Sequence, residues 1–245
     1  MKITIITPTR NSENTIKQNL QSINFQNYRN IEHIIIDGKS KDKTLEIINH
    51  FKKKKVTKVF SSKDKGIYYA LNKGLRSATG KVICFLNSDD YYPDKKIISS
   101  VIKIFKNSKS DIVYGNLNYV KKNHKIFRKW RSQNFETKLL NKGWMPPHPA
   151  TFIKKKIIKK KNYFNINFEI SSDYDFLINL FNKKKNKTKY YNKVLVHMLI
   201  GGKSNKNLSS IFKKSYEDYL IIKKNKIGGL YTLILKNFSK LNQLF

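Results

Sequence analysis

The stretch Val82-Ile83-Cys84-Phe85-Leu86-Asn87-Ser88-Asp89-Asp90-Tyr91-Tyr92 is an apolar run of strand length that ends in two adjacent carboxylates. An unbroken apolar run of this length is typical of a strand that is buried on both faces, as in a parallel sheet. In open α/β sheets, ligands bind where the carboxyl ends of such strands emerge. We therefore predict an α/β domain with a binding site around Asp89 and Asp90.

Two neighbouring carboxylates without a basic residue beside them suit a divalent cation that carries phosphates. An alternative is that Ser88, Asp89 or Asp90 caps a helix that starts near Pro93. Capping accounts for one of these residues but not for the adjacent pair. We therefore expect Asp89 and Asp90 to hold Mn²⁺ or Mg²⁺ against a diphosphate.

The residues before this stretch alternate between strand and helix patterns. The predicted strands are Lys2–Thr7, which Pro8 stops, Glu32–Ile36 and Val56–Phe60. The predicted helices are 13–23, capped by Ser12, then 44–51, capped by Ser40 or Asp42, and one from the turn at Asp64 that closes at Gly74 or Gly80. This order predicts βαβ units with right-handed crossovers, and hence a mostly parallel central sheet flanked by helices.

After the acidic stretch, the pattern predicts a helix over 95–105 and a strand over 112–116. Residues 117–150 lose the alternation, with hairpin strands at 117–120 and 125–130 and a proline-rich loop in which Trp144 is a candidate for stacking on a sugar ring. A helix starts at Ser171-Ser172, and a strand over 193–200 contains His197. We expect one domain over 1–204, with a nucleotide-binding half (1–116) and an acceptor half (117–204).

Residues 205–245 form a C-terminal tail with a different pattern. Apolar residues recur there at helical spacing, and lysines fill the other faces. The apolar set is Ile211, Phe212, Tyr216, Tyr219, Leu220, Leu230, Ile234, Phe238, Leu241 and Phe245. Basic amphipathic helices of this kind either pack on the domain or lie in a membrane interface, and both alternatives are open.

The net charge of +35 at first suggests a nucleic-acid-binding protein. However, the lysine runs are not interleaved with stacking aromatic residues, and no nucleic-acid-binding motif is present. We expect a solvated surface or attraction to an anionic membrane, and no nucleic-acid partner. The single cysteine, no signal-peptide pattern and no apolar run of roughly 18–20 residues predict a cytoplasmic protein, or one peripheral on the inner membrane face.

A series of short motifs carries a resemblance to a known family. They are Ile5-Ile6-Thr7-Pro8-Thr9-Arg10-Asn11, Ile35-Ile36-Asp37-Gly38-Lys39-Ser40, Asp64-Lys65-Gly66-Ile67-Tyr68-Tyr69-Ala70, Phe85-Leu86-Asn87-Ser88-Asp89-Asp90 and Ser172-Asp173-Tyr174-Asp175. In their order and spacing the chain resembles the family 2 glycosyltransferases, the inverting nucleotide-sugar transferases of the GT-A fold. Asn87 and Ser172 depart from that family's pattern, because acidic residues often stand at these two positions.

The resemblance implies a role for each matching residue. Those implied to bind the nucleotide sugar are Thr7, Pro8, Thr9, Asn11, Asp37, Asp64, Gly66, Asn87, Ser88 and Asp89. Those implied to contact the metal are Asp89, Asp90 and His197, with His148 as an alternative to the histidine. Asp173 is implied to be the general base that deprotonates the acceptor hydroxyl, and Asp175 is the other candidate for this role.

The implied function is transfer of a hexose from a nucleotide diphosphate sugar, with UDP expected, to a hydroxyl group. The acceptor would be a saccharide or lipid-linked saccharide in surface-glycan synthesis, reached through the basic tail on an anionic membrane. Three alternatives stay open at this point: a nucleic-acid-binding protein, a sugar nucleotidyltransferase and a transferase that has lost its activity. The segment after the first strand contains no glycine, which counts against the nucleotidyltransferase.

Overall fold

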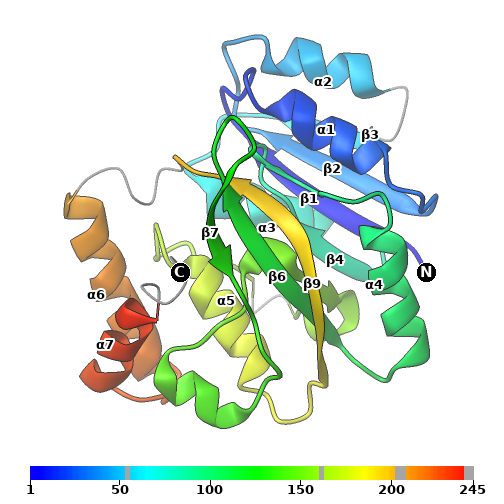
Figure 1. Ribbon diagram of the computed structural model, residues 1–245. Coiled ribbons are helices and arrows are strands. Elements are labelled where there is room, and N and C mark those ends of the chain that lie inside the picture. Colours follow the sequence, from blue (N-terminus) through cyan, green and yellow to red (C-terminus); the bar gives the residue numbers. More distant parts are fainter. Residues whose placement is uncertain (53–55, 160–162, 202–207, 240–245) are drawn as a thin grey trace.

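The computed structural model describes residues 1–52, 56–159, 163–201 and 208–239. Leu241, Phe245 and the expected boundary between domain and tail at 204–205 lie outside these ranges. Figure 1 shows a curled central sheet with helices on both faces. The strands are β1 (Ile3–Thr9), β2 (Ile31–Asp37), β3 (Val56–Ser61), β4 (Val82–Phe85), β5 (Asp90–Tyr91), β6 (Ile112–Val120), β7 (Ile126–Trp130), β8 (Thr151–Lys154) and β9 (Thr188–Leu199).

The strands lie in the order β3-β2-β1-β4-β8-β6-β9-β5, and β7 pairs with β6 outside this path. The first four strands are parallel, as the βαβ pattern predicts. β8 then lies antiparallel between β4 and β6, so the second half of the sheet is mixed. The expected α/β class is therefore confirmed: the N-terminal half of the sheet is parallel throughout, and in the second half β6 and β9 are also parallel.

The helices are α1 (Ile16–Asn24), α2 (Thr44–Lys52), α3 (Ile67–Ser77), α4 (Ile97–Asn107), α5 (Ser172–Phe181), α6 (Leu208–Lys224) and α7 (Leu230–Phe238). Apolar residues of α1 and α4 pack on one face of the sheet. Those of α3, α5 and α6 form the core on the other face. A fully buried isoleucine or leucine in such a core contributes roughly 1.5–3 kcal/mol to stability.

Two residues that were expected to end a strand or a helix lie inside one. Pro8 belongs to β1 and is opposite Ile36 of β2. The last pair between β1 and β4 is Ile6 with Phe85, so Pro8 lies where β1 has a free edge and a proline is tolerated. Gly74 lies within α3 and does not end it, because this helix packs closely on β1. A Cβ atom at position 74 would come within 2.4 Å of Ile6 Cγ2.

Two further expectations about the bounds of helices and strands are corrected, one by a local turn and one by a tertiary contact. The first helix begins at Ile16 and not at residue 13, because residues 12–15 form a turn. Residues 112–120 form one strand, where the pattern predicted two. β9 pairs along the whole of β6, with register shifts around Asn116. Gly115 permits this pairing, since a Cβ atom there would come within 2.6 Å of Leu195.

The expected tail helices, α6 and α7, pack on the domain. Figure 1 shows them beside α5, at the lower left of the molecule. Ile221 and Ile222 of α6 are fully buried, and Thr232 of α7 donates a hydrogen bond to the Asn141 carbonyl oxygen at 2.8 Å. Of the helices described, none combines the length and the apolar character that crossing a membrane requires.

Candidate active site

The carboxyl ends of the first three strands bring polar side chains into one row. Thr9 of β1 lies opposite Asp37 of β2, and Asp37 lies opposite Ser61 of β3. The Ser61 hydroxyl donates a hydrogen bond to Asp37 Oδ2 at 2.6 Å. Ser40 binds the same carboxylate through its backbone N–H and its hydroxyl group. These contacts fix the orientation of Asp37, which is fully buried.

Asp64 lies near this row, in the loop between β3 and α3. Burial raises its pKa, the charge of Lys73 opposes the rise, and the charge of Asp37 adds to it. The two carboxylates are therefore within electrostatic reach of each other. Asp64 Oδ2 is buried and has no hydrogen-bond partner among the described residues. A buried acceptor without a partner is costly, so a bound N–H or O–H group would stabilise it.

The loop after β1 reaches the same end of the sheet. Asn11 has a left-handed backbone (φ 49°), and its side-chain oxygen accepts a hydrogen bond from Lys41 N at 2.9 Å. The Ser12 hydroxyl does not cap α1 but lies 2.9 Å from the Ser88 hydroxyl, so it connects this loop to the acidic turn. Thr7 points elsewhere, because its hydroxyl is hydrogen-bonded to His33 Nε2 in the interior.

Asp89 and Asp90 lie between β4 and β5 and have different surroundings. Asp89 is half-buried, and burial raises its pKa. Asp90 is fully buried; burial first, and then the charge of Asp89, raise its pKa well above the usual range. Asn87 Nδ2 donates to Asp90 Oδ2 at 3.1 Å, whereas Oδ1 has no partner within the described chain.

These two carboxylates fit a hard divalent cation, which prefers oxygen ligands. A cation would relieve both the repulsion between the two acids and the unpartnered oxygen of Asp90. No group of three or more His, Cys, Asp or Glu side chains in the described ranges is placed to hold a metal. Asp89, Asp90 and His197 therefore do not form a complete site, and further ligands would have to come from the substrate.

His197 already has partners on both ring nitrogens. Its Nδ1 lies 3.3 Å from the Tyr91 hydroxyl, and its Nε2 lies 3.5 Å from Asn118 Nδ2. His197 is the cross-strand partner of Tyr91, while Asp90 is opposite Met198. Because side chains alternate along a strand, Tyr91 and His197 share one face, and Asp90 is on the other. His197 is thus not brought to Asp90.

Asp173 and Asp175 lie in the first turn of α5 and have different partners. Asp173 is half-buried, and the Tyr68 hydroxyl lies 3.4 Å from its Oδ1. Asp175 is buried and forms an ion pair with Lys224 at 3.0 Å. Of the two, Asp173 therefore has the carboxylate that is partly exposed to solvent and is not in an ion pair among the described residues.

His148 lies close behind Asp173. It stacks on Phe85 at the end of β4, with 4.8 Å between ring centroids. Burial lowers the pKa of His148 to about 4, and the charge of Asp173 opposes this shift. The imidazole is thus neutral near pH 7. Its Nε2 is buried without a partner among the residues placed by the structure.

Tyr119 of β6 lies within electrostatic reach of both the acidic turn and the start of α5. Burial raises its pKa, the nearby Arg128 opposes the rise, and the charges of Asp90 and Asp173 both add to it. Both candidate site acids are therefore within electrostatic reach of one side chain. Tyr119 stacks parallel to Trp130, and the Arg128 guanidinium lies 4.2 Å from its ring centroid. Sequence patterns gave no signal for Tyr119, because only the pairing of β6 with β7 makes this group.

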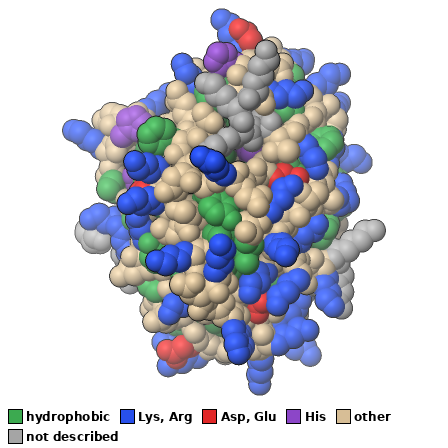
Figure 2. Space-filling model, turned by 90° about the vertical axis from the view of Figure 1, so that its right-hand side faces the viewer, with side chains coloured by type: hydrophobic (Ala, Val, Ile, Leu, Met, Phe, Trp, Pro, Cys, Tyr) green, Lys and Arg blue, Asp and Glu red, His purple; other side chains and the backbone are tan. Residues whose placement is uncertain are grey.

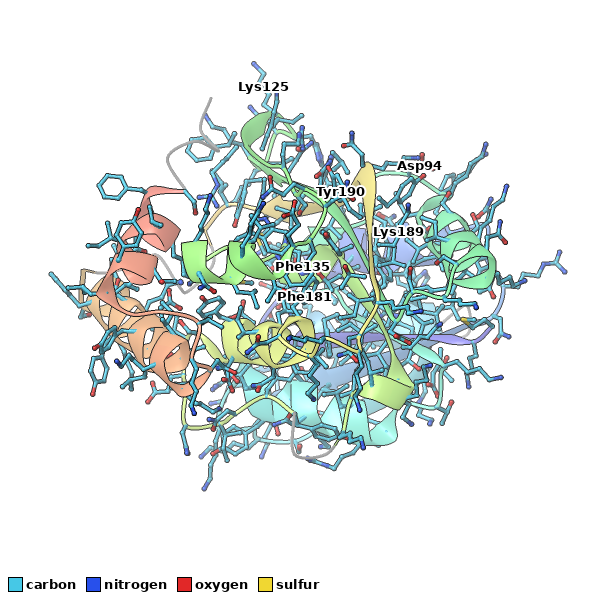
Figure 3. All side chains as sticks on the ribbon, turned by 90° about the horizontal axis from the view of Figure 1, so that it is seen from below. Asp94, Lys125, Phe135, Phe181, Lys189 and Tyr190 are labelled. Atoms are coloured by element: carbon cyan, nitrogen blue, oxygen red, sulfur yellow. The ribbon has the colours of Figure 1, made fainter. Side chains whose placement is uncertain are left out.

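Trp144, a sequence candidate for sugar stacking, is half-buried within an aromatic cluster. It stacks on Phe135 at 5.8 Å and lies 6.0 Å from Phe181, measured between ring centroids. Figure 3 labels Phe135 and Phe181, which lie together near α5. Trp144 therefore helps to pack α5 against the rest of the domain.

Comparison with known proteins shows the family to which the chain belongs. The sequence matches the family described as Glycosyl transferase family 2 over residues 4–187. The chain therefore belongs to glycosyltransferase family 2, as the motifs predict, and it is a transferase. It is similar to the UDP-Glc:alpha-D-GlcNAc-diphosphoundecaprenol beta-1,3-glucosyltransferase WfaP of Escherichia coli, with 36% identity over 124 residues. The aligned region covers 51% of this chain and 49% of WfaP.

Solved structures confirm the fold. S. aureus TarS 1-349 in complex with UDP-GlcNAc superposes with a TM-score of 0.73 at 19% identity, covering 93% of this chain and 66% of that one. The mannosyltransferase PcManGT from Pyrobaculum calidifontis, in complex with GDP-Man and Mn2+, superposes with a TM-score of 0.68 at 15% identity, covering 97% and 69%. The expected GT-A fold is thereby confirmed.

Proposed function

We propose that this protein transfers a hexose from a UDP-sugar to a hydroxyl group with inversion at the anomeric carbon. The observation that supports this best is the placement of three acidic sites around the carboxyl ends of β2, β3 and β4. Asp37 and Asp64 form the first, Asp89 and Asp90 the second, and Asp173 the third. The first site would bind the nucleoside, the second would bind the diphosphate through a metal ion, and the third would take the proton of the acceptor hydroxyl.

In this mechanism Asp37 and Asp64 bind hydrogen-bond donors of the nucleoside. Asp89 and Asp90 would hold Mn²⁺ or Mg²⁺, which would supply positive charge beside the diphosphate leaving group. We favour these two residues alone for the metal, because His197 is hydrogen-bonded to Tyr91 and Asn118. Mn2+ in the complex of PcManGT supports a divalent ion.

Asp173 acts as the general base. Its carboxylate removes the proton from the acceptor hydroxyl while that oxygen attacks the anomeric carbon. The bond from this carbon to the diphosphate oxygen breaks, and its electron pair leaves with the nucleoside diphosphate. The transition state carries oxocarbenium character, as in glycoside hydrolysis. A single displacement converts an α-linked donor into a β-linked product.

Two relatives support the choice of donor and acceptor. TarS is solved with UDP-GlcNAc, and WfaP is named for UDP-Glc and a diphosphoundecaprenol-linked acceptor. We therefore propose a UDP-sugar donor and a lipid-linked saccharide acceptor, in the synthesis of a surface glycan. Such an acceptor would place the protein at the cytoplasmic face of the inner membrane.

The exposed side of the tail supports contact with an anionic membrane. Apolar side chains with at least 37% exposure lie along α6 and α7; they are Ile211, Phe212, Tyr216, Leu220, Leu230, Tyr231, Ile234 and Phe238. The two acids of α6 are buried, so its solvent-facing charges are lysines. Figure 2 shows Lys and Arg spread widely over another face as well. Apolar and basic groups together favour an anionic lipid surface.

Liposome flotation tests this contact. Phosphatidylglycerol liposomes should retain the protein at moderate salt, phosphatidylcholine liposomes should not, and Phe212→Ser should weaken retention. Phe25→Ser is the matched control, because Phe25 is similarly exposed (73% against 75%) but follows α1. Equal retention of both variants, or none of the wild type, would contradict the proposal.

Hydrolysis of UDP-α-glucose tests inversion without an identified acceptor, because water takes the place of the hydroxyl. Proton NMR, recorded before the released glucose mutarotates, should show the β anomer first. Initial release of the α anomer would overturn the single-displacement mechanism.

A further inference from the structure

Helix α6 lies beyond the family match, which ends at residue 187, yet it holds the segment that leads into Asp173. The Glu217 carboxylate accepts hydrogen bonds from three consecutive backbone N–H groups. Its Oε1 accepts from Glu169 N at 2.9 Å. Its Oε2 accepts from Ile170 N at 3.0 Å and from Ser171 N at 2.8 Å.

These contacts hold the three residues that precede α5, while in the first turn itself the Tyr174 N–H donates to Asp173 Oδ1 at 2.9 Å. Ser171 is the N-cap residue of α5, and no side chain in the described chain caps the helix from that position. Glu217 is only 4% exposed, so its charge depends on these N–H donors for stabilisation. Hydrogen bonds to a buried carboxylate are stronger than neutral ones, and therefore they restrain the segment well.

The same segment is held from the other side by α3. The Tyr68 hydroxyl donates to the Ile170 carbonyl oxygen at 2.5 Å and lies 3.4 Å from Asp173 Oδ1. Burial, then the charge of Asp173 and, more weakly, that of Glu217 raise the pKa of Tyr68 well above its usual range, so it remains a donor. The segment is thus held through the N–H groups of residues 169–171 and through the Ile170 carbonyl oxygen.

We propose that Glu217 is a positioning residue for the general base, so that α6 is part of the active site. This inference rests on the proposed role of Asp173. It accounts for how the residues that lead into Asp173 are held, although the Ser171 side chain makes no capping hydrogen bond. A displacement of about 1 Å at a reacting group can cost on the order of 100-fold in rate.

Steady-state UDP release from UDP-glucose with Mn²⁺, with water as acceptor, tests the proposal. Glu217→Gln should lower kcat at least about 10-fold with donor KM unchanged, because its amide group cannot accept all three N–H bonds. Lys224→Met is the matched control, since it removes the ion pair of α6 with Asp175 but not the contacts of Glu217. It should lower the melting temperature while kcat of the folded protein stays near wild type.

Wild-type kcat in folded Glu217→Gln, or an equal loss of kcat in Lys224→Met, would overturn the inference. If Glu217→Gln does not fold, Glu217→Asp decides, because it keeps the charge but shortens the reach of the carboxylate: reduced kcat at unchanged donor KM supports the positioning role, and wild-type kcat contradicts it. Asp173→Asn separates the two proposals. If it keeps wild-type kcat, the proposed base is wrong; if it is inactive while Glu217→Gln is fully active, only the positioning role fails.

Discussion

The Lys224 ammonium group donates hydrogen bonds to both carboxylate oxygens of Asp175, at 3.1 and 3.0 Å. Asn225 adds a third donor to the same carboxylate at 3.2 Å. Asp175 thus joins α5 to α6 and is only 2% exposed. Asp173, two residues earlier, has no such ion pair among the described contacts and lies near Tyr119 and His148. This difference favours Asp173 as the base.

We predict that Asp173→Asn lowers kcat by about 10²–10⁴-fold while UDP-glucose still binds, because only proton removal is lost. Asp175→Asn should instead lower the melting temperature and leave kcat of the folded protein within a few-fold of wild type. UDP release and thermal shift measure both effects. Loss of turnover in Asp175→Asn alone would reverse the assignment.

Ser61→Ala should weaken donor binding. The Ser61 hydroxyl orients Asp37 Oδ2, so its loss should raise the donor KM roughly 10-fold and leave kcat little changed. Ser99→Ala is the control, because the Ser99 hydroxyl contacts only a backbone carbonyl of the described chain, at the start of α4. An unchanged KM for UDP-glucose in Ser61→Ala would argue against a donor role for Asp37.

The buried Asp90 gives a pH dependence of stability. Its pKa is raised in the native state, so between the unfolded pKa of about 4 and that raised value the native state holds more protons. Stability of the metal-free protein therefore falls as pH rises through this window. Asp90→Asn should remove this fall and be more stable than wild type at pH 7.5.

The gain from Asp90→Asn should shrink at pH 4.5, because the native carboxyl is still protonated there and the pH is within one unit of the unfolded pKa of about 4, so little of the linked loss of stability has developed. Each unit by which the pKa is raised corresponds to about 1.4 kcal/mol. Urea unfolding in EDTA at the two pH values measures the difference in unfolding free energy between Asp90→Asn and wild type. A variant less stable than wild type at pH 7.5 would show that the carboxylate is well accommodated without a metal.

Glu32 should cause the opposite pH dependence of stability to that of Asp90. Burial alone would raise its pKa, but hydrogen bonds from Thr4, Thr79 and Lys58 lower it to about 2. The stability that it contributes is present above its unfolded pKa and is lost as pH falls from about 4.5 to about 2. Glu32→Gln should flatten this acid transition by roughly 2–3 kcal/mol in urea unfolding. An unchanged acid transition would contradict the role of Glu32.

Local sequence patterns located those candidate site residues that lie at the ends of strands and helices. Asp37, Asp89 and Asp173 each follow a strand or begin a helix, and these positions depend on neighbours in sequence. Ser61 reaches Asp37 across 24 residues, and Glu217 reaches Ser171 across 46. Such contacts arise from strand order and helix packing, which a single sequence does not encode in any short pattern.

The ends that the sequence wrongly predicted for β1 and α3 are also explained by contacts between residues that are distant in sequence. Pro8 and Gly74 are local stop signals, but a free strand edge and the close packing of α3 on Ile6 override them. Trp144 was a reasonable sugar-binding candidate by residue type. Its position in the cluster with Phe135 and Phe181 was set by α5, which follows more than two dozen residues later.

A thermal-shift screen of nucleotide sugars with Mn²⁺ and with EDTA, on wild type and Asp89→Asn, tests directly whether Asp89 and Asp90 form a metal–diphosphate site. Wild type should be stabilised by one UDP-sugar in the presence of Mn²⁺, and both EDTA and the substitution should remove this effect. If no nucleotide sugar stabilises the protein, or if the shift is the same in EDTA and in Asp89→Asn, the metal–diphosphate site at Asp89 and Asp90 does not exist.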